Sequence, residues 1–143
     1  MIALALLAAQ ATAVGAPSAD TAAIMAPIEA TLAAMQAKDG AALLAQTVPT
    51  GGTTSVVDGV ATRTSWADMA ASLKPGGPNF TVRMATPAVE VDGDVAMVWA
   101  RYTFQLDGKP PRCGVDHFDL VRDQGHWRIL NLTFSSRATG CGA

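Results

Sequence analysis

One acidic and one basic residue in neighbouring predicted strands have the clearest capacity for chemistry. Asp116 lies in the β-rich run 113–122, and Arg101 lies in the run 95–106. A carboxyl group acts as a general acid or base when burial or a nearby charge shifts its pKa toward the working pH. A guanidinium beside it can orient the carboxylate or bind a substrate anion. We therefore take Asp116 and Arg101 as the candidate catalytic pair.

Two predicted hairpins bring this pair together. An Asp-Gly pair at 107–108 and a Gln-Gly pair at 124–125 separate three runs rich in β-forming residues. Glycine adopts the positive φ of tight turns without steric cost, so both pairs indicate turns between antiparallel strands. We expect Asp123 to pair with His126 across the second turn.

The alternation of side chains along a strand assigns each residue to one of two faces of the sheet. The register that we expect for the first hairpin sets Trp99 beside Phe118 and Arg101 beside Asp116. We take this face as the interior because it holds large aromatic residues and its polar members gather at one end. It carries Met97, Trp99, Arg101, Asp116, Phe118, Leu120, Trp127, Ile129, Asn131 and Thr133. The outer face carries Val98, Ala100, Tyr102, Phe104, His117, Asp119, Arg128, Leu130, Leu132 and Phe134.

A ligand cavity on the interior face would use aromatic residues for its walls and polar ones as hydrogen-bond donors. Large aromatics at these spacings can instead form a packed core. The pair Asp116 and Arg101 can equally be an ion pair that fixes strand register, and Arg101 would then lower the pKa of Asp116 and weaken it as a base. The candidate ligand-binding residues are Trp66, Trp99, Phe118, Trp127, Asn131 and Thr133.

Other classes of site and partner lack support in the sequence. A metal site needs three or four converging ligands, and we find no such cluster, so we expect no metal and no cofactor. His117 and His126 fall on the outer face and beside a turn, where a solvated or interface role is commoner than catalysis. A formal charge of -2 without a basic run gives no surface for nucleic acid or an anionic membrane.

The N-terminal residues 1–16 are apolar, with small residues at Ala11, Ala13 and Ala16 where a signal peptidase could cut. This pattern is typical of a secretory signal peptide. The alternatives are a mis-assigned start or an apolar arm that packs on the domain. We expect a periplasmic or secreted protein in which residues 17–143 form a single domain.

The two cysteines, Cys113 and Cys141, are expected to form a disulfide in an oxidising compartment. Such a bond would attach the C-terminal tail to the sheet. Two free, partly buried thiols are the alternative, and they would be favoured if the chain stays in the cytoplasm.

The remaining elements follow from periodicity and capping signals. Apolar residues at helical spacing from Ile24 to Met35 predict an amphipathic helix, with Pro27 inside it or at its start. Ser65 and Asp68 form a capping box for another helix. Residues 47–52 are expected to be loop because they contain proline and glycine. The expected order is helix, helix, hairpin, helix and a four-stranded meander.

Three stretches resemble the nuclear transport factor 2-like superfamily, which includes ketosteroid isomerase, SnoaL-type polyketide cyclases and lumazine-binding-like small bacterial proteins. They are residues 92–99, 116–122 and 125–131. The resemblance implies an α+β fold: a cone-shaped half-barrel whose curved, mainly antiparallel sheet wraps around N-terminal helices. It also implies a conical pocket and frequent dimerisation through the outer sheet face, although that face could simply be a partly apolar solvent surface.

We expect an exported domain that binds a small organic ligand in this pocket without catalysis. One alternative is a small enzyme of the isomerase, cyclase or hydrolase type that uses Asp116 for proton transfer. Another is a homodimeric interaction module with a vestigial pocket. An open pocket with Asp116 at its wall would favour the enzyme, and a pocket filled by tryptophan would favour the interaction module.

Overall fold

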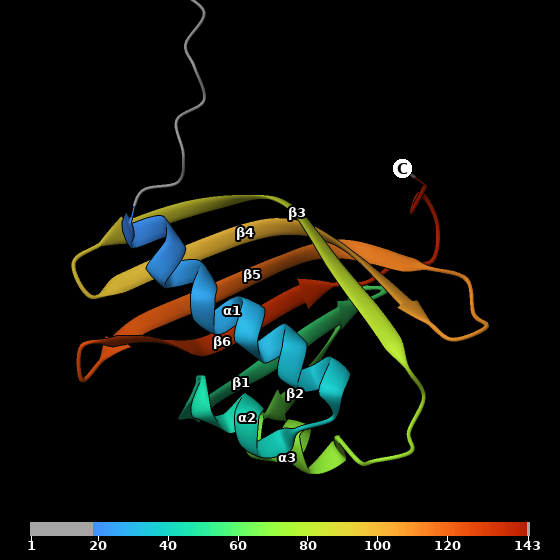
Figure 1. Ribbon diagram of the computed structural model, residues 1–143. Coiled ribbons are helices and arrows are strands. Elements are labelled where there is room, and N and C mark those ends of the chain that lie inside the picture. The colour runs from blue at the N-terminus through green and yellow to red at the C-terminus, as the bar shows by residue number, and fades with distance from the viewer. Residues whose placement is uncertain (1–18, 143) are drawn as a thin grey trace, which may run out of the picture.

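Helices pack across one face of a curved, open sheet in the computed structural model, which describes residues 19–142 (Figure 1). The helices are α1 (Ala19–Ala37), α2 (Gly40–Ala45) and α3 (Trp66–Ser72). The strands are β1 (Thr47–Val57), β2 (Val60–Ser65), β3 (Phe80–Asp92), β4 (Val95–Leu106), β5 (Arg112–Asp123) and β6 (His126–Ser135). This is the expected α+β architecture. The expected signal peptide lies outside the described residues.

The sheet has six strands in the order β2-β1-β6-β5-β4-β3. All neighbours are antiparallel except β1 and β6, which are parallel. β3 contains a bulge between Ala85 and Ala88, where Thr86 has φ 40°. A bulge increases the local bend and twist of a strand, so it helps the long sheet to curve around the helices.

Local sequence signals account for the helices. α1 buries Ile24, Ile28 and Ala34 along one side, and Pro27 lies inside the helix. The side chain of Asp39 accepts a hydrogen bond from the backbone N–H of Ala42 and so caps α2. The predicted capping box of α3 is confirmed, since Ser65 Oγ accepts from the backbone N–H of Asp68 at 3.0 Å.

Residues 47–52 form the start of β1, so the expected loop is wrong. A Cβ at Gly51 would lie 1.6 Å from the carbonyl oxygen of Leu130 in β6. Glycine is therefore needed here because two backbones approach closely, and not because the chain turns.

The register between β4 and β5 differs by one residue from the expected one. Trp99 pairs with His117 and Arg101 pairs with Val115, while Ala100 is the partner of Asp116. A shift of one residue moves every side chain to the opposite face. The loop that contains Pro110 and Pro111 determines the observed register, and the length of this loop could not be inferred from the turn residues. Met97, Trp99 and Arg101 therefore lie on the outer face, and Val98, Ala100, Tyr102 and Phe104 lie on the inner face.

The register between β5 and β6 is confirmed near the turn and wrong beyond it. Asp123 pairs with His126 as expected, but Leu130 is an extra residue in a bulge. Its carbonyl oxygen accepts a hydrogen bond from the indole N–H of Trp66 at 2.9 Å. The bulge exchanges the faces of the residues that follow. Asn131 and Thr133 therefore lie on the outer face, whereas Leu132 and Phe134 lie on the inner face.

The core lies between the helices and the inner face of the sheet. Its most deeply buried large side chains come from α1, α2, α3 and the central strands, and they are fully excluded from solvent. They are Ile24, Ile28, Leu43, Trp66, Val98, Phe118, Leu120 and Ile129.

Candidate functional site

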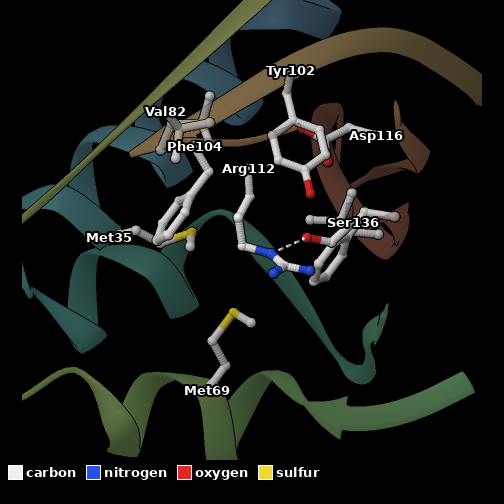
Figure 2. Close-up of a pocket in the computed structure, with 11 residues that line it drawn as sticks. Met35, Met69, Val82, Tyr102, Phe104, Arg112, Asp116 and Ser136 are labelled. Atoms are coloured by element: carbon white, nitrogen blue, oxygen red, sulfur yellow. Dashed lines mark hydrogen bonds between the residues drawn. The ribbon is translucent and has the colours of Figure 1, made fainter. Parts of the chain in front are cut away.

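A cavity of about 260 Å³ lies between the helices and the inner face of the sheet (Figure 2). Its walls come from α1, α3, all four strands of the meander and the segment after β6. Most of the lining is apolar: Leu32, Met35, Met69, Val82, Phe104, Leu132 and Phe134. The polar lining consists of Tyr102, Arg112, Asp116 and Ser136.

Asp116 is the ionisable acid of this cavity. Strand alternation places it on the inner face of β5, two residues before the core residue Phe118. It is 5% exposed, and the described part of the chain provides its carboxylate with no hydrogen bond or ion pair. Burial raises the pKa of Asp116 from 3.8 to about 7 because the charged form loses its hydration. At neutral pH both protonation states are therefore populated.

Tyr102 lies beside Asp116 on the inner face. Its hydroxyl donates a hydrogen bond to the backbone oxygen of Ser135 at 2.8 Å. Burial, reinforced by the charge of Asp116, raises the pKa of Tyr102 above its usual value. Its ring meets Phe134 edge to face at 6.3 Å between centroids. Tyr102 is thus held in place as a neutral phenol.

Arg112 brings a positive charge to the same cavity. Its Nε donates a hydrogen bond to Ser136 Oγ at 2.9 Å. Within residues 19–142 its guanidinium pairs with no carboxylate. No acidic side chain of the described residues therefore neutralises the charge of Arg112.

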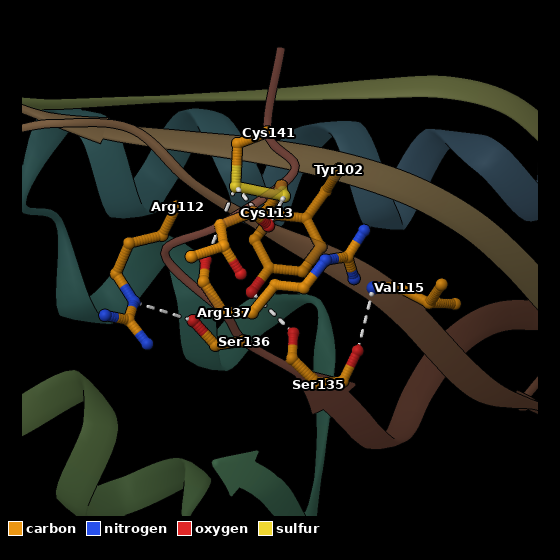
Figure 3. The surroundings of a disulfide bond; sticks show 9 residues. Tyr102, Arg112, Cys113, Val115, Ser135, Ser136, Arg137 and Cys141 are labelled. Carbon is orange, nitrogen blue, oxygen red and sulfur yellow. Dashed lines mark hydrogen bonds between the residues drawn. A yellow bond between two sulfur atoms is a disulfide. The ribbon is translucent and has the colours of Figure 1, made fainter. Parts of the chain in front are cut away.

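The disulfide between Cys113 and Cys141 holds the C-terminal tail against this end of the sheet (Figure 3). Its Cα atoms are 5.4 Å apart. Cys113 and Arg137 also form two backbone hydrogen bonds, from each N–H to the other's carbonyl oxygen, at 3.0 and 2.9 Å. The predicted disulfide is present, and it fixes the segment that carries Ser136.

Of the predicted site residues, the structure places only Asp116 in the cavity. Arg101 is exposed on the opposite face of the sheet, so the expected pair with Asp116 is wrong. Trp66 and Phe118 belong to the core. Trp127 contacts the guanidinium of Arg122 at 4.8 Å. The others are on the outer face: Trp99, which is 52% exposed, and Asn131 and Thr133.

Sequence reasoning missed Tyr102, Arg112 and Ser136. The correct register would have placed Tyr102 on the face of Asp116, because Asp116 is the partner of Ala100 and Tyr102 lies two residues beyond Ala100 on the same strand. Arg112 precedes Cys113, and Ser136 precedes the residue that pairs with Cys113. The predicted disulfide was thus the available signal that these two side chains lie near each other.

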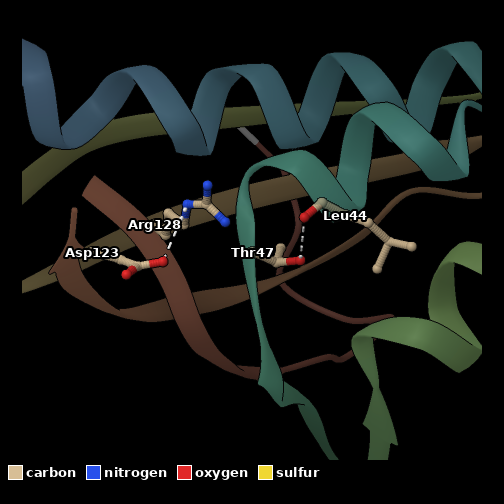
Figure 4. A network of polar contacts seen from close by, with 4 residues as sticks. All are labelled: Leu44, Thr47, Asp123 and Arg128. Atoms are coloured by element: carbon tan, nitrogen blue, oxygen red, sulfur yellow. Dashed lines mark hydrogen bonds and ion pairs between the residues drawn. The ribbon is translucent and has the colours of Figure 1, made fainter. Parts of the chain in front are cut away.

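A second hollow of about 470 Å³ lies at the other end of the molecule, between α1 and the turn from β5 to β6. Its charged residue Arg128 is paired with Asp123 at 3.6 Å (Figure 4). Nearby, Thr47 Oγ1 donates to the backbone oxygen of Leu44 at 3.3 Å. These contacts join the ends of elements, and Arg128 already has a carboxylate partner, whereas the smaller cavity holds a buried acid that has no partner among the described residues. The smaller cavity is therefore the better candidate site.

Residues 19–142 contain no group of three or more His, Cys, Asp or Glu side chains able to hold a metal ion. None of their helices is both long and apolar enough to cross a membrane.

Comparison with known proteins identifies the family. A family model described as a SnoaL-like domain matches residues 17–133. The chain belongs to the SnoaL-like family. A comparison of this SnoaL-like protein with curated proteins found no significant match.

Solved structures share the fold at low identity. A nuclear transport factor 2-like protein of unknown function from Pseudomonas putida has a TM-score of 0.68 and 14% identity, covering 85% of this SnoaL-like chain and 89% of its own. A similar protein from Silicibacter pomeroyi has a TM-score of 0.62 and 22% identity, covering 84% and 98%. A candidate scytalone dehydratase from Novosphingobium aromaticivorans has a TM-score of 0.67 and 12% identity, covering 82% and 84%. These likenesses support the nuclear transport factor 2-like fold.

Proposed function

We propose that the cavity binds a small, mainly apolar organic molecule and that Asp116 exchanges a proton with it. The observation that carries this proposal is a buried, unpaired carboxyl group at the wall of an apolar cavity. Apolar pockets with a few converging polar groups are the usual form of small-molecule sites. A perturbed carboxyl in such a pocket is a candidate acid or base on physical grounds.

The raised pKa suits proton transfer. A general acid or base works best when its pKa is near the operating pH, and that of Asp116 is about 7. The expected objection, that Arg101 would lower this pKa, does not apply because Arg101 lies on the other face. The ionised form can take a proton from a bound molecule, and the protonated form can return it at another atom.

Ligand binding without catalysis is the second candidate function. The mostly apolar lining favours it, and among the described residues that line the cavity Asp116 is the only carboxyl group, so no second carboxyl is present to relay a proton.

Proton transfer is tested by hydrogen–deuterium exchange. Small apolar ketones and aromatic carbonyl compounds would be screened for binding by ligand-observed NMR, and binders would be followed in D₂O for loss of C–H protons next to the carbonyl. We expect Asp116→Asn to slow this exchange by about 100-fold or more. Asp119→Asn is the matched control, since Asp119 is on the outer face of the same strand.

Equal exchange by wild type and Asp116→Asn would contradict the acid–base role. Binding with no exchange in the wild type would support the second candidate. Failure of every compound to bind would contradict the small-molecule site itself.

We further propose that two copies associate through the outer face of the sheet. The residues first expected to form this contact were Tyr102, Phe104, Leu130, Leu132 and Phe134. Four of them lie on the inner face instead, and Leu130 lies in the bulge of β6. The outer face nevertheless exposes Val95, Met97 and Trp99 as adjacent apolar side chains. The charged residues Arg101 and Asp119 flank them. A patch that holds both signs of charge around an apolar centre can be complementary to its own copy.

The association is tested with Trp99→Glu. We expect the wild type to sediment as a dimer and the variant as a monomer in analytical ultracentrifugation, because a buried glutamate would oppose the contact. A monomeric wild type would contradict the proposal.

We also propose that the protein is exported. The disulfide supports this proposal because such bonds persist mainly in oxidising compartments. The expected signal peptide at residues 1–16 would direct the export, with residues 17–143 as the mature domain.

A further inference from the structure

Resting on the proposed small-molecule site, we propose that the natural ligand is a small apolar acid whose anionic head group binds Arg112. The apolar body would lie against Met35, Met69 and Phe104, which line the same cavity. The inference assigns a charge to the ligand, and it makes Arg112 the residue that selects for it.

The state of the Arg112 guanidinium is the first observation. One of its nitrogens is used by Ser136, and in the described chain the rest of the group has neither a hydrogen bond nor an ion pair. Other arginines of the sheet have carboxylate neighbours: Arg122 is 3.3 Å from Asp94, and Arg128 is 3.6 Å from Asp123. Arg112 is half-buried in a mainly apolar lining and still lacks a counterion. An anion that binds stabilises a partly buried cation more than it stabilises a fully solvated cation.

Asp116 does not serve as that counterion. No ion pair joins the two side chains in the structure, although both line the cavity. A close guanidinium would lower the pKa of the carboxyl, whereas the pKa of Asp116 is raised and burial is the cause. The free donors of Arg112 are therefore left to a ligand.

The surrounding backbone holds Arg112 ready for this contact. Ser136, which accepts from its Nε, is itself anchored by a backbone hydrogen bond from its N–H to the oxygen of Val56 at 3.1 Å. Cys113 follows Arg112 and Arg137 follows Ser136, and these two residues pair with each other. The disulfide attaches the tail beyond them (Figure 3). Figure 2 shows the guanidinium directed into the cavity beside Ser136. A planar fork fixed in this way suits the two oxygens of a carboxylate.

The volume limits the size of the acid. A cavity of about 260 Å³ is smaller than the ~300–1,000 Å³ of typical drug-sized sites. It suits one ring system or a short alkyl chain with a single head group.

The test uses two probes of matched shape, 1-naphthylacetate and its neutral amide 1-naphthylacetamide. Their dissociation constants would be measured by NMR titration at pH 7 with the full chain. We expect the acid to bind at least about tenfold more tightly than the amide to the wild type, as a charged hydrogen-bonded pair would provide. Arg112→Gln should remove this preference by weakening the acid alone, and Arg112→Lys should restore part of it. Arg101 is an exposed arginine on the outer face, so Arg101→Gln is the matched control and should retain the preference.

The outcomes separate this inference from the proposed function. Equal affinity for acid and amide in the wild type, or an unchanged preference in Arg112→Gln, would overturn the inference and leave the small-molecule site standing. Absence of binding by both probes at millimolar concentration, together with no binder in the carbonyl screen, would overturn both.

Discussion

Asp116→Asn is expected to be more stable than the wild type at pH 8, by a margin that approaches about 4 kcal/mol. In the unfolded chain the carboxyl titrates near its usual pKa of 3.8, whereas in the folded protein its pKa is about 7. At pH 8 the folded protein must therefore hold an unpaired, buried negative charge that the unfolded chain exposes to water. A difference of about three pKa units corresponds to about 4 kcal/mol.

The pH dependence of this margin follows from proton linkage. Between pH 4 and pH 7 the folded state binds more protons at Asp116 than the unfolded state does, so its contribution to stability is present at low pH and lost as pH rises toward 7. Above pH 7 the loss is complete and the margin levels off. The unfolding free energies of wild type and Asp116→Asn should therefore converge toward pH 4 and separate toward pH 8.

Urea unfolding of both proteins at intervals from pH 4 to pH 8 measures this margin. Asp119→Asn is the control because the Asp119 side chain is 46% exposed on the outer face of the same strand, so its removal should not give a gain in stability that grows toward pH 8. A wild type more stable than Asp116→Asn at pH 8 would mean that the carboxylate has a structural partner, which would contradict its role as a free acid–base group.

Removal of the disulfide has the second largest expected effect. We expect Cys113→Ala with Cys141→Ala to lose about 3 kcal/mol of unfolding free energy, because a bond between residues 28 apart restricts the unfolded chain. Urea unfolding of the double variant under oxidising conditions measures the loss. Wild type treated with dithiothreitol should approach the variant, whereas the variant itself should not respond to the reductant. Equal stability of oxidised wild type and double variant would contradict the expectation.

Much of the architecture was predictable because its signals are local. The turns at 107–108 and 124–125, the capping box of α3 and the order of the elements all follow from residues close together in the chain. Glycine at a turn or a serine at a helix start acts through its own neighbours, so no distant contact is needed to interpret it.

The faces of β4 and of the second part of β6 were not predictable because they depend on contacts between residues far apart in the chain. The bulge at Leu130 is held by Trp66, which lies 64 residues away in sequence. The register of β4 depends on the length of the proline-containing loop between β4 and β5, and the turn residues alone do not determine that length. Two single-residue shifts were enough to exchange the inner and outer faces, and they removed Arg101 from the site and introduced Tyr102.

Asp116 itself was predictable because it lies on the strand whose alternation was followed correctly. Phe118 and Leu120 mark the inner face of β5, and Asp116 shares their parity. Tyr102 comes from the shifted strand and Ser136 from the tail after β6, so their presence in the cavity required the structure. Arg112 shares the parity of Asp116 on β5, but it precedes the start at residue 113 that was predicted for this strand.

The most direct test of the central claim is an NMR titration of the Asp116 side-chain carboxyl carbon from pH 3 to pH 9, with Asp116→Asn used to assign its signal. The claim is that this carboxyl is buried, unpaired and able to exchange a proton at neutral pH. We expect a midpoint at about 7. A midpoint near 4 would show that the carboxylate is hydrated or paired in solution, and it would contradict the proposed role of Asp116.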